Sequence, residues 1–224
     1  MARGGVQVIP RPGIWRPGPP APWAGRELDV SLDRIRAVFT GRSGTRSPVE
    51  AHGAQRSAVL APFFEVDDRT HVLVTRRAWD MRHHRGEVSF PGGGEEPDDG
   101  GDTVRTALRE SHEEVGLDPS LVEVLGELDH LTTVSSDRSI VPVVGILGAR
   151  PADLIAQASE VEAILEVAVD DLLHPESYRE ERWGPLDIDH PVFFFEIEGD
   201  TIWGATAAML RQFLLLLADA TAPT

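Results

Sequence analysis

The stretch that decides the fold is GEVSFPGGGEEPDDGGDTVRTALRESHEEVGL, residues 86–117, because it joins a glycine-rich turn to an acidic helix. We expect the helix to begin after Asp102, whose side chain can accept hydrogen bonds from the free N–H groups of the first turn. We expect it to end at Gly116, since glycine suits the left-handed position that closes a helix. Small and apolar residues then share one face, which should pack on a core. These residues are Val104, Ala107, Leu108, Ser111 and Val115.

Three glutamates lie in the second half of this helix in an unfavourable arrangement. Glu110 and Glu114 are one turn apart along one border of the apolar face, and Glu113 and Arg109 lie further round the helix. Like charges at that spacing repel by about 0.2–0.5 kcal/mol on an exposed helix. The helix dipole also disfavours anions towards the C-terminal end. The arrangement therefore suggests that a cation belongs beside these side chains.

The glycine-rich turn can complete such a cation site. Carboxylate oxygens and water are the ligands that Mg²⁺ and Mn²⁺ prefer, and no side chain blocks a backbone carbonyl in a run of glycines. We therefore interpret Pro91-Gly92-Gly93-Gly94 as the opposite wall of a metal site. Taken alone, the carboxylates would favour a solvated helix face, because most charge runs on helices are only that. The turn and the terminal Glu-Glu-Val-Gly-Leu make the metal site the better interpretation.

Two motifs in this region resemble those of a known family. Behind Gly92-Gly93, the run RESHEEVGL at residues 109–117 is similar to the Nudix box, the metal-binding loop-helix-loop of hydrolases that split a nucleoside diphosphate linked to another moiety. A second motif resembles the narrower signature of the coenzyme A pyrophosphatase branch, with Val74 where a second leucine is usual. It consists of Leu73-Val74-Thr75-Arg76-Arg77-Ala78, Arg82, Gly86 and Phe90-Pro91-Gly92-Gly93. A further segment similar to the same branch is Thr106-Ala107-Leu108-Arg109-Glu110.

The match departs from the family pattern in the loop before the helix. The pattern has a glutamate six residues after a loop glycine and seven residues before the arginine. Here Gly93 leads to Asp99, and nine residues separate Asp99 from Arg109. Ser111 also stands where an aliphatic residue is usual. The departures leave the helix ligands intact and leave the upstream acidic ligand unassigned.

The resemblance implies a set of metal ligands. In the family, the first glutamate after the arginine and the last of the Glu-Glu pair bind metal, which corresponds to Glu110 and Glu114 here. Glu113 is an additional ligand, and the carbonyl of Gly92 fills the backbone position. Arg109 would hold the carboxylates by ion pairing rather than contact substrate. The cofactor would be Mg²⁺ or Mn²⁺, which neutralises phosphate oxygens and acidifies water.

Two further roles have more than one interpretation. Nudix enzymes often take the proton acceptor from a distant loop, so Glu160 is the first candidate and Glu110 the alternative. Glu160 would fit a solvated strand edge equally well. Arg77 and Arg82 match arginines of the narrower signature and are candidates to bind substrate phosphates. They would otherwise pair with the acidic loop at residues 95–99.

Composition restricts the classes of partner. The chain has 37 aspartates and glutamates against 21 arginines and no lysine, a net charge of −16. Such a charge argues against general nucleic-acid binding, because a phosphate backbone would be repelled. The only basic cluster is RRAWDMRHHR, residues 76–85. Without cysteine, an N-terminal signal or an apolar run long enough to cross a membrane, we expect a cytoplasmic protein that binds no membrane.

The chain divides into three parts. Residues 1–26 contain six prolines and predict an extended arm, either loose or packed on a partner subunit. Residues 27–56 predict a helix over Glu27–Thr40, followed by a polar linker. Residues 57–220 are expected to form the Nudix-like domain. The inward residues of the first helix are Leu32, Ile35 and Phe39.

The order of elements predicts an α/β fold. Ser57–Val66 and Thr70–Arg77 flank Asp67-Asp68-Arg69, a hairpin signal. A last turn at Glu198-Gly199-Asp200 should lead to a helix over Ala205–Ala218. Mixed strands with a few helices indicate a mixed β-sheet between helices, an α/β/α sandwich, and the Nudix resemblance implies the same. Other strands are expected at Val122–Leu128, Ser139–Leu147, Glu162–Val169, Ser177–Trp183 and Pro191–Ile197.

Together these observations predict a metal-dependent pyrophosphohydrolase. The resemblance implies that it cleaves coenzyme A or an acyl derivative to 3′,5′-ADP and the 4′-phosphopantetheine part. An alternative keeps the chemistry and changes the substrate to ADP-ribose, a dinucleotide or an oxidised nucleotide. A second alternative is a non-catalytic ligand-sensing module, against which the intact Glu110, Glu113 and Glu114 weigh. Homodimers are common in the family, which makes a homodimer possible here.

Overall fold

A computed structural model describes residues 3–46, 55–133 and 138–220. In these ranges the central sheet has eight strands and is mixed. β3 (Gln55–Val66) lies in the middle, antiparallel to β4 (Arg69–Arg77) and parallel to β9 (Arg138–Leu147). Most of β3 is buried, as expected for a strand that is covered on both faces. The other strands are β5 (Val88–Ser89), β6 (Gly92–Gly94), β7 (Val122–Glu127), β8 (Leu131–Thr133) and β10 (Val161–Ala168).

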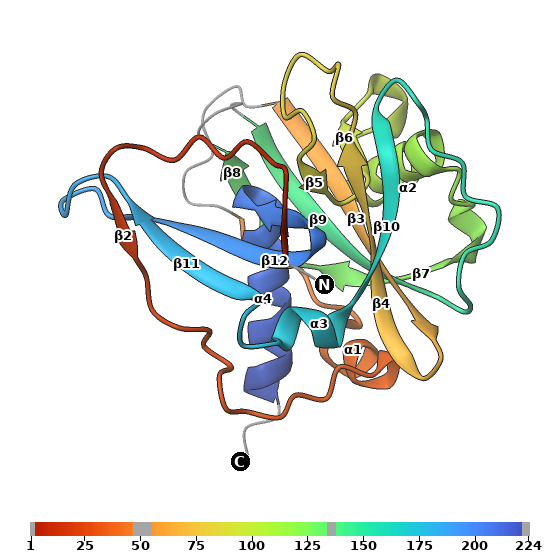
Figure 1. Cartoon of the computed structure of the whole chain (residues 1–224). Coiled ribbons are helices and arrows are strands. Elements are labelled where there is room, and N and C mark those ends of the chain that lie inside the picture. The colour runs from red at the N-terminus through yellow and green to blue at the C-terminus, as the bar shows by residue number, and fades with distance from the viewer. Residues whose placement is uncertain (1–2, 47–54, 134–137, 221–224) are drawn as a thin grey trace.

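Helices cover both faces of this sheet (Figure 1). α2 (Thr103–Val115) packs on one face, where Ala107 and Val115 join the buried side chains of β3 and β9. On the other face, α1 (Leu32–Phe39) and α4 (Gly204–Ala220) enclose a larger aromatic core. The predicted α/β/α sandwich with a mixed sheet is confirmed. No helix within the described ranges is both long and apolar enough to cross a membrane.

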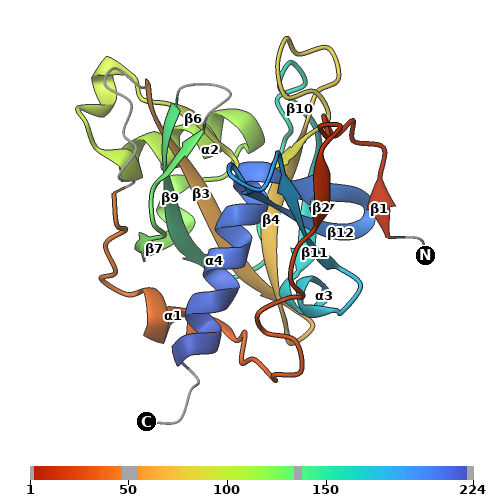
Figure 2. The ribbon, with the colours of Figure 1, turned by 90° about the vertical axis from the view of Figure 1, so that its left-hand side faces the viewer.

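A second sheet lies beside α4 (Figure 2). Its strands run in the order β1-β12-β11-β2, and the short α3 (Val169–Leu173) connects it to β10. β1 and β2 come from the N-terminal segment, so this segment pairs with strands from the end of the chain. The bounds are β1 (Gly4–Gly5), β2 (Trp15–Pro17), β11 (Tyr178–Trp183) and β12 (His190–Trp203).

The N-terminal segment is extended as predicted, but it packs on its own chain rather than hanging loose. Trp23 is only 2% exposed and stacks on Phe195, with the ring of Tyr178 edge-on at 5.1 Å. Burial of one such aromatic side chain contributes about 1.5–3 kcal/mol, which is enough to hold an otherwise irregular segment.

Two boundaries differ from prediction. α1 begins at Leu32 rather than near Glu27, because the side chain of Ser31 accepts a hydrogen bond from the Arg34 N–H and caps the helix there. The predicted turn at residues 198–200 is wrong, because β12 runs through it without a break. Gly199 takes a φ of +76° inside the strand, which bends β12 without ending it.

Candidate active site

The acidic helix α2 forms as its end signals predict. The side chain of Asp102 accepts hydrogen bonds from the Val104 and Arg105 N–H groups at 3.0 and 3.2 Å. Gly116 closes the helix in the left-handed conformation, with a φ of +71°. Ser111 is buried and donates to the Ala107 carbonyl, so a small hydroxyl fits where an aliphatic residue was expected.

Glu114 is the most deeply buried of the three helix glutamates, at 3% exposure. Its carboxylate accepts a hydrogen bond from the Gly92 N–H at 3.1 Å, and the Arg77 guanidinium lies 3.8 Å away. Burial raises its pKa to about 7, against the lowering effects of Gly92 and Arg77, and the charges of Glu160 and Glu110 raise it further. The site therefore holds this carboxylate at a cost that a bound cation would relieve.

Glu110 lies one turn before Glu114 and fills the space above Gly93. A Cβ added to Gly93 would lie 2.4–2.6 Å from the Glu110 carboxylate, so a glycine is required for this close approach. Burial raises the pKa of Glu110, while the Arg109 guanidinium at 3.1 Å lowers it. Glu113 points outward with 55% of its side chain exposed. Glu110 and Glu114 thus face the glycine-rich strand, whereas Glu113 lies at the rim.

The Gly92–Gly94 segment, expected as a bend, is the short strand β6 paired with β3. The Leu60 N–H donates to the Pro91 carbonyl at 2.9 Å, and Gly92 lies opposite Val59. Hydrogen-bonded and non-hydrogen-bonded pairs alternate in an antiparallel ladder, so Gly92 falls at a non-hydrogen-bonded position. Its N–H and carbonyl both point away from β3, and the N–H reaches Glu114. The carbonyl is therefore directed to the side on which α2 lies.

Arg109 ties the acidic loop to α2. Its guanidinium donates to both oxygens of Asp99 at 3.1 and 3.0 Å, to the Gly94 carbonyl at 2.9 Å and to Glu113 at 3.0 Å. Asp99 is 2% exposed and also accepts from the Thr106 hydroxyl. The Arg109 guanidinium holds the pKa of Asp99 well below its ordinary range. Asp99, left unassigned by the family pattern, therefore serves as the buried partner of Arg109.

Glu160 is exposed and lies just before β10. Its charge raises the pKa of both Glu110 and Glu114. Its backbone carbonyl accepts a hydrogen bond from the Ala78 N–H at 2.9 Å, which joins it to the loop that follows β4. Figure 1 shows that this loop, the loop before α2 and the start of β10 meet at one end of the molecule.

The arginines of the basic cluster at residues 76–85 differ in their surroundings, since some face acidic side chains of the protein and others are exposed to solvent. Arg76 makes two hydrogen bonds to Asp200, at 3.1 and 2.9 Å, and so belongs to the scaffold. Arg77 faces Glu114 rather than the acidic loop at residues 95–99. Arg82 is exposed, and the described part of the chain offers it no hydrogen bond or ion pair. Arg82 is therefore available to an anionic ligand.

Sequence reasoning missed the network that anchors this loop. The Gln7 side chain donates to the Gly86 carbonyl at 3.1 Å and to Asp200 at 2.5 Å, and the Thr201 N–H donates to Gln7 at 2.8 Å. Asp200 is 2% exposed and also holds Arg76. An aspartate expected in a turn gave no signal of this role, because its partners are distant in sequence.

The donor atoms around Glu110 and Glu114 fit a hard divalent cation. They are carboxylate oxygens and a backbone carbonyl, which suit Mg²⁺ or Mn²⁺ and not a thiolate-preferring metal. Among residues 3–46, 55–133 and 138–220, no three Asp, Glu or His side chains are arranged to hold an ion by themselves. A cation here would therefore also need backbone oxygen, water or substrate oxygens, as Mg²⁺ commonly does.

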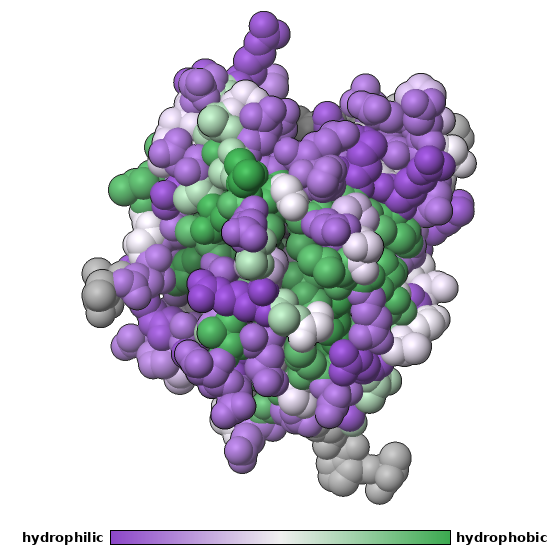
Figure 3. All heavy atoms as spheres, turned by 90° about the vertical axis from the view of Figure 1, so that its right-hand side faces the viewer, coloured by the Kyte–Doolittle hydropathy of each residue, from purple (hydrophilic) through white to green (hydrophobic). Residues whose placement is uncertain are grey.

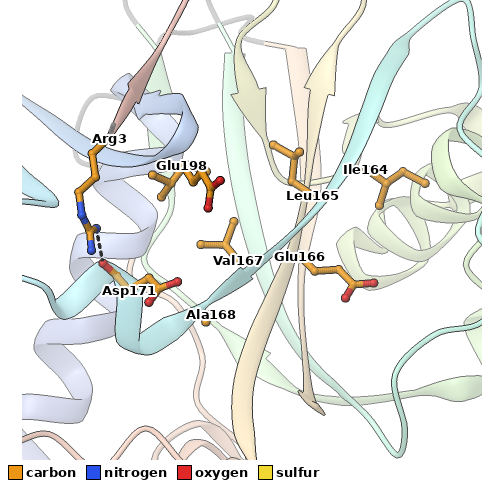
Figure 4. A pocket seen from close by; sticks show the side chains of 9 residues that line it. Arg3, Ile164, Leu165, Glu166, Val167, Ala168, Asp171 and Glu198 are labelled. Atoms are coloured by element: carbon orange, nitrogen blue, oxygen red, sulfur yellow. Dashed lines mark hydrogen bonds between the residues drawn. The ribbon is translucent and has the colours of Figure 1, made fainter. Parts of the chain in front are cut away.

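The surface around the site is polar. Figure 3 shows that the end of the molecule carrying these loops is mostly hydrophilic, whereas hydrophobic side chains gather in the middle of the same face. A separate hollow of about 410 Å³ lies between β10 and β12 (Figure 4). Arg3, Asp171 and Glu198 line it together with apolar residues, and none of the α2 glutamates does. The hollow is therefore distinct from the candidate active site.

Comparisons with known proteins identify the family of this chain. A family model described as NUDIX domain matches residues 54–186. The chain is 37% identical over 200 residues to a protein named Nudix hydrolase 22, chloroplastic, from Arabidopsis thaliana, covering 82% of this chain and 66% of that protein. It is 36% identical over 173 residues to an uncharacterized Nudix hydrolase, NudL, from Pectobacterium atrosepticum, covering 75% of this chain and 85% of the relative.

A solved structure supports the fold. The crystal structure of a MutT/nudix family protein from Enterococcus faecalis superposes with a TM-score of 0.54 at 15% sequence identity, covering 84% of this chain and 70% of that one. At this identity the likeness concerns the fold alone.

Proposed function

Since this chain belongs to the Nudix family and is a Nudix hydrolase, an enzyme that acts on phosphoric anhydrides, we propose that it cleaves the diphosphate of coenzyme A or an acyl-CoA. The products would be 3′,5′-ADP and the (acyl-)4′-phosphopantetheine part. The observation that carries the proposal is the burial of Glu114 between the Gly92 N–H and Arg77, with Glu110 beside it. Such a carboxylate pair needs a cation, and a cation so held can bind a diphosphate.

We propose that Glu110, Glu114 and the Gly92 carbonyl hold Mg²⁺ or Mn²⁺, with Glu113 as a further ligand. When bound, the ion would neutralise oxygens that gain charge in the transition state and would lower the pKa of water. The residues support this assignment, because Glu110 and Glu114 are shielded from solvent and every atom they would offer to a metal is an oxygen. Glu113 keeps an exposed carboxylate at the rim, where it can reach the ion directly or through water.

The remaining residues would position groups and move the proton. Arg109 keeps Glu110 and β6 in register through its bonds to Glu110 and the Gly94 carbonyl, and it does not need to touch substrate. Glu160 is our first candidate to accept the proton of the attacking water, because it is exposed and its charge acts on both Glu110 and Glu114. Glu110 is the alternative.

The substrate class rests on the residues after β4. The spacing of Arg77, Arg82 and Gly86 before the glycine strand matches the narrower coenzyme A signature. The exposed Arg82 supports it, because coenzyme A carries a phosphate apart from its diphosphate and guanidinium groups bind phosphates with two hydrogen bonds. ADP-ribose, dinucleotides and oxidised nucleotides remain alternatives with the same chemistry. The homodimer and the cytoplasmic location stay predictions of the sequence.

A side-by-side hydrolysis screen tests the proposal. The full-length protein is incubated with coenzyme A, acetyl-CoA, ADP-ribose and a dinucleoside polyphosphate, with Mg²⁺, with Mn²⁺ and with EDTA, and products are identified by mass spectrometry. We expect metal-dependent release of 3′,5′-ADP at the highest kcat/KM from the coenzyme A compounds. Faster cleavage of ADP-ribose would contradict the substrate, and tight binding without cleavage of any compound would favour the sensing module.

A further inference from the structure

Trp79 is a large aromatic side chain that the proposed chemistry does not use. It lies in the loop between β4 and β5 and is 40% exposed. A single exposed aromatic residue is common on protein surfaces and needs no explanation by itself. The packing of this ring and the anchoring of its loop beside Arg77 are what make it informative.

One face of the Trp79 ring rests on Gly86. A Cβ added to Gly86 would lie 2.4 Å from Cη2 and 2.6 Å from both Cζ2 and Cζ3. Nearly equal distances to three adjacent ring carbons place that Cβ over the face of the ring rather than beyond its edge. Within the described ranges, no other aromatic ring and no guanidinium packs on Trp79. One face is thus covered by backbone, while 40% of the residue stays exposed.

The loop that carries Trp79 is anchored at both ends. The Gly86 N–H donates to the Arg77 carbonyl at 3.1 Å, and the Arg77 N–H donates to the Glu87 carbonyl at 2.9 Å. The Gly86 carbonyl accepts from Gln7 of the N-terminal segment. A ring held in this way loses little freedom when a ligand packs on it, which is the condition for an effective binding surface.

Trp79 also follows the end of a strand that contacts one of the proposed metal-binding carboxylates. It is two residues after Arg77, whose guanidinium faces Glu114. The neighbouring Ala78 is hydrogen-bonded to Glu160, whose charge reaches Glu110 and Glu114. In a nucleoside diphosphate, one sugar separates the base from the diphosphate, so a stacking partner must stand beside the phosphate site and not within it.

We propose that the face of the Trp79 ring turned away from Gly86 stacks on the nucleobase of the substrate while the diphosphate lies at Glu110 and Glu114. The proposal rests on the proposed function and names the residue that binds the base. Stacking of a base on an aromatic side chain changes affinity by roughly 5- to 150-fold on truncation to alanine. Every base has a π face, so Trp79 recognises a nucleotide as such, and the exposed Arg82 on the same loop can bind its phosphate.

The test compares two ligands that have no diphosphate to cleave. AMP carries a base, and ribose 5-phosphate has the same sugar phosphate without it. Calorimetric titration of the full-length protein should show that Trp79→Ala weakens AMP binding by roughly 5- to 150-fold and leaves ribose 5-phosphate unchanged. Trp79→Phe should retain most of the affinity. Trp15→Ala is the matched control, because Trp15 is 42% exposed but lies in the second sheet, and it should change neither ligand.

A second readout keeps the proposal testable if Trp79→Ala fails to fold. AMP, and not ribose 5-phosphate, should quench tryptophan fluorescence of the wild-type protein, and Trp79→Phe should abolish the quenching. The proposal is overturned if AMP binds wild-type protein no more tightly than ribose 5-phosphate, or if Trp79→Ala weakens both ligands equally. Failure of the proposed function gives a different pattern, in which no diphosphate is cleaved while AMP still binds through Trp79.

Discussion

Replacing Glu114 with glutamine should stabilise the metal-free protein and remove its response to metal. Burial raises the pKa of Glu114 from an ordinary value of 4.5 to about 7, so holding it ionised above pH 7 costs up to about 3 kcal/mol at about 1.4 kcal/mol per unit. Glutamine is neutral and keeps an oxygen that can accept from the Gly92 N–H. For a chain of this size, the gain corresponds to a rise in Tm of up to roughly 6–12 °C.

The pH dependence follows from the sign of that shift. A carboxyl whose pKa is higher in the folded state binds more protons there than in the unfolded state between pH 4.5 and about 7. In EDTA, the contribution of Glu114 to the free energy of unfolding of the wild type should therefore fall as pH rises through this window. Glu114→Gln should lack this fall, so the two proteins should differ little at pH 5 and most at pH 8.

Thermal unfolding in EDTA and in Mg²⁺, at pH 5 and pH 8, measures both effects. Saturating Mg²⁺ should raise the Tm of the wild type through ligand binding to the folded state and should leave Glu114→Gln almost unchanged. Glu113→Gln is the control, since it removes the same charge from a side chain that is 55% exposed and should shift Tm little in EDTA. If Glu114→Gln melts no higher than wild type at pH 8 in EDTA, the argument from burial is refuted.

Three further variants test other parts of the site. Gly93→Ala should fold but lose most activity, because its Cβ would displace the Glu110 carboxylate. Gly94→Ala is the control and should keep activity, since the nearest atom to its Cβ would be 3.9 Å away. Equal kcat values for the two variants would contradict the close approach of Glu110 to Gly93. Arg82→Ala should raise KM more than it lowers kcat, and an unchanged KM would exclude substrate binding. Asp99→Asn should lower the free energy of unfolding by about 1.5–3 kcal/mol in denaturant titrations, because it removes the buried charge that accepts two hydrogen bonds from Arg109, which keeps Glu110 and Glu113 as acidic partners; a loss below about 1 kcal/mol would contradict that role.

Most of the correct predictions came from residues that determine the backbone conformation next to them. The bounds of α2 follow from Asp102 and Gly116, which satisfy the helix ends without help from the rest of the chain. The hairpin between β3 and β4 follows from Asp67 and Asp68, both of which take positive φ values. The meeting of Glu110 and Glu114 with the glycine strand was inferred from their helical spacing and from the glycine run, and the Nudix resemblance implied the same ligands.

The errors came where distant contacts override a local preference. Turn-forming residues at 198–200 predicted a break in β12, but Gly199 accommodates the bend and Asp200 is buried by Gln7 and Arg76. The N-terminal segment has no periodicity, so nothing in it indicated that Trp23 fills the core. The pairing of Asp99 with Arg109 was hidden by the longer loop between them.

The most direct test of the central claim is to locate manganese in a crystal of this protein by anomalous diffraction. A peak within coordination distance of Glu110, Glu114 and the Gly92 carbonyl is the predicted result. Full occupancy by manganese elsewhere in the crystal, with these two carboxylates left apart and no peak between them and β6, would contradict the claim.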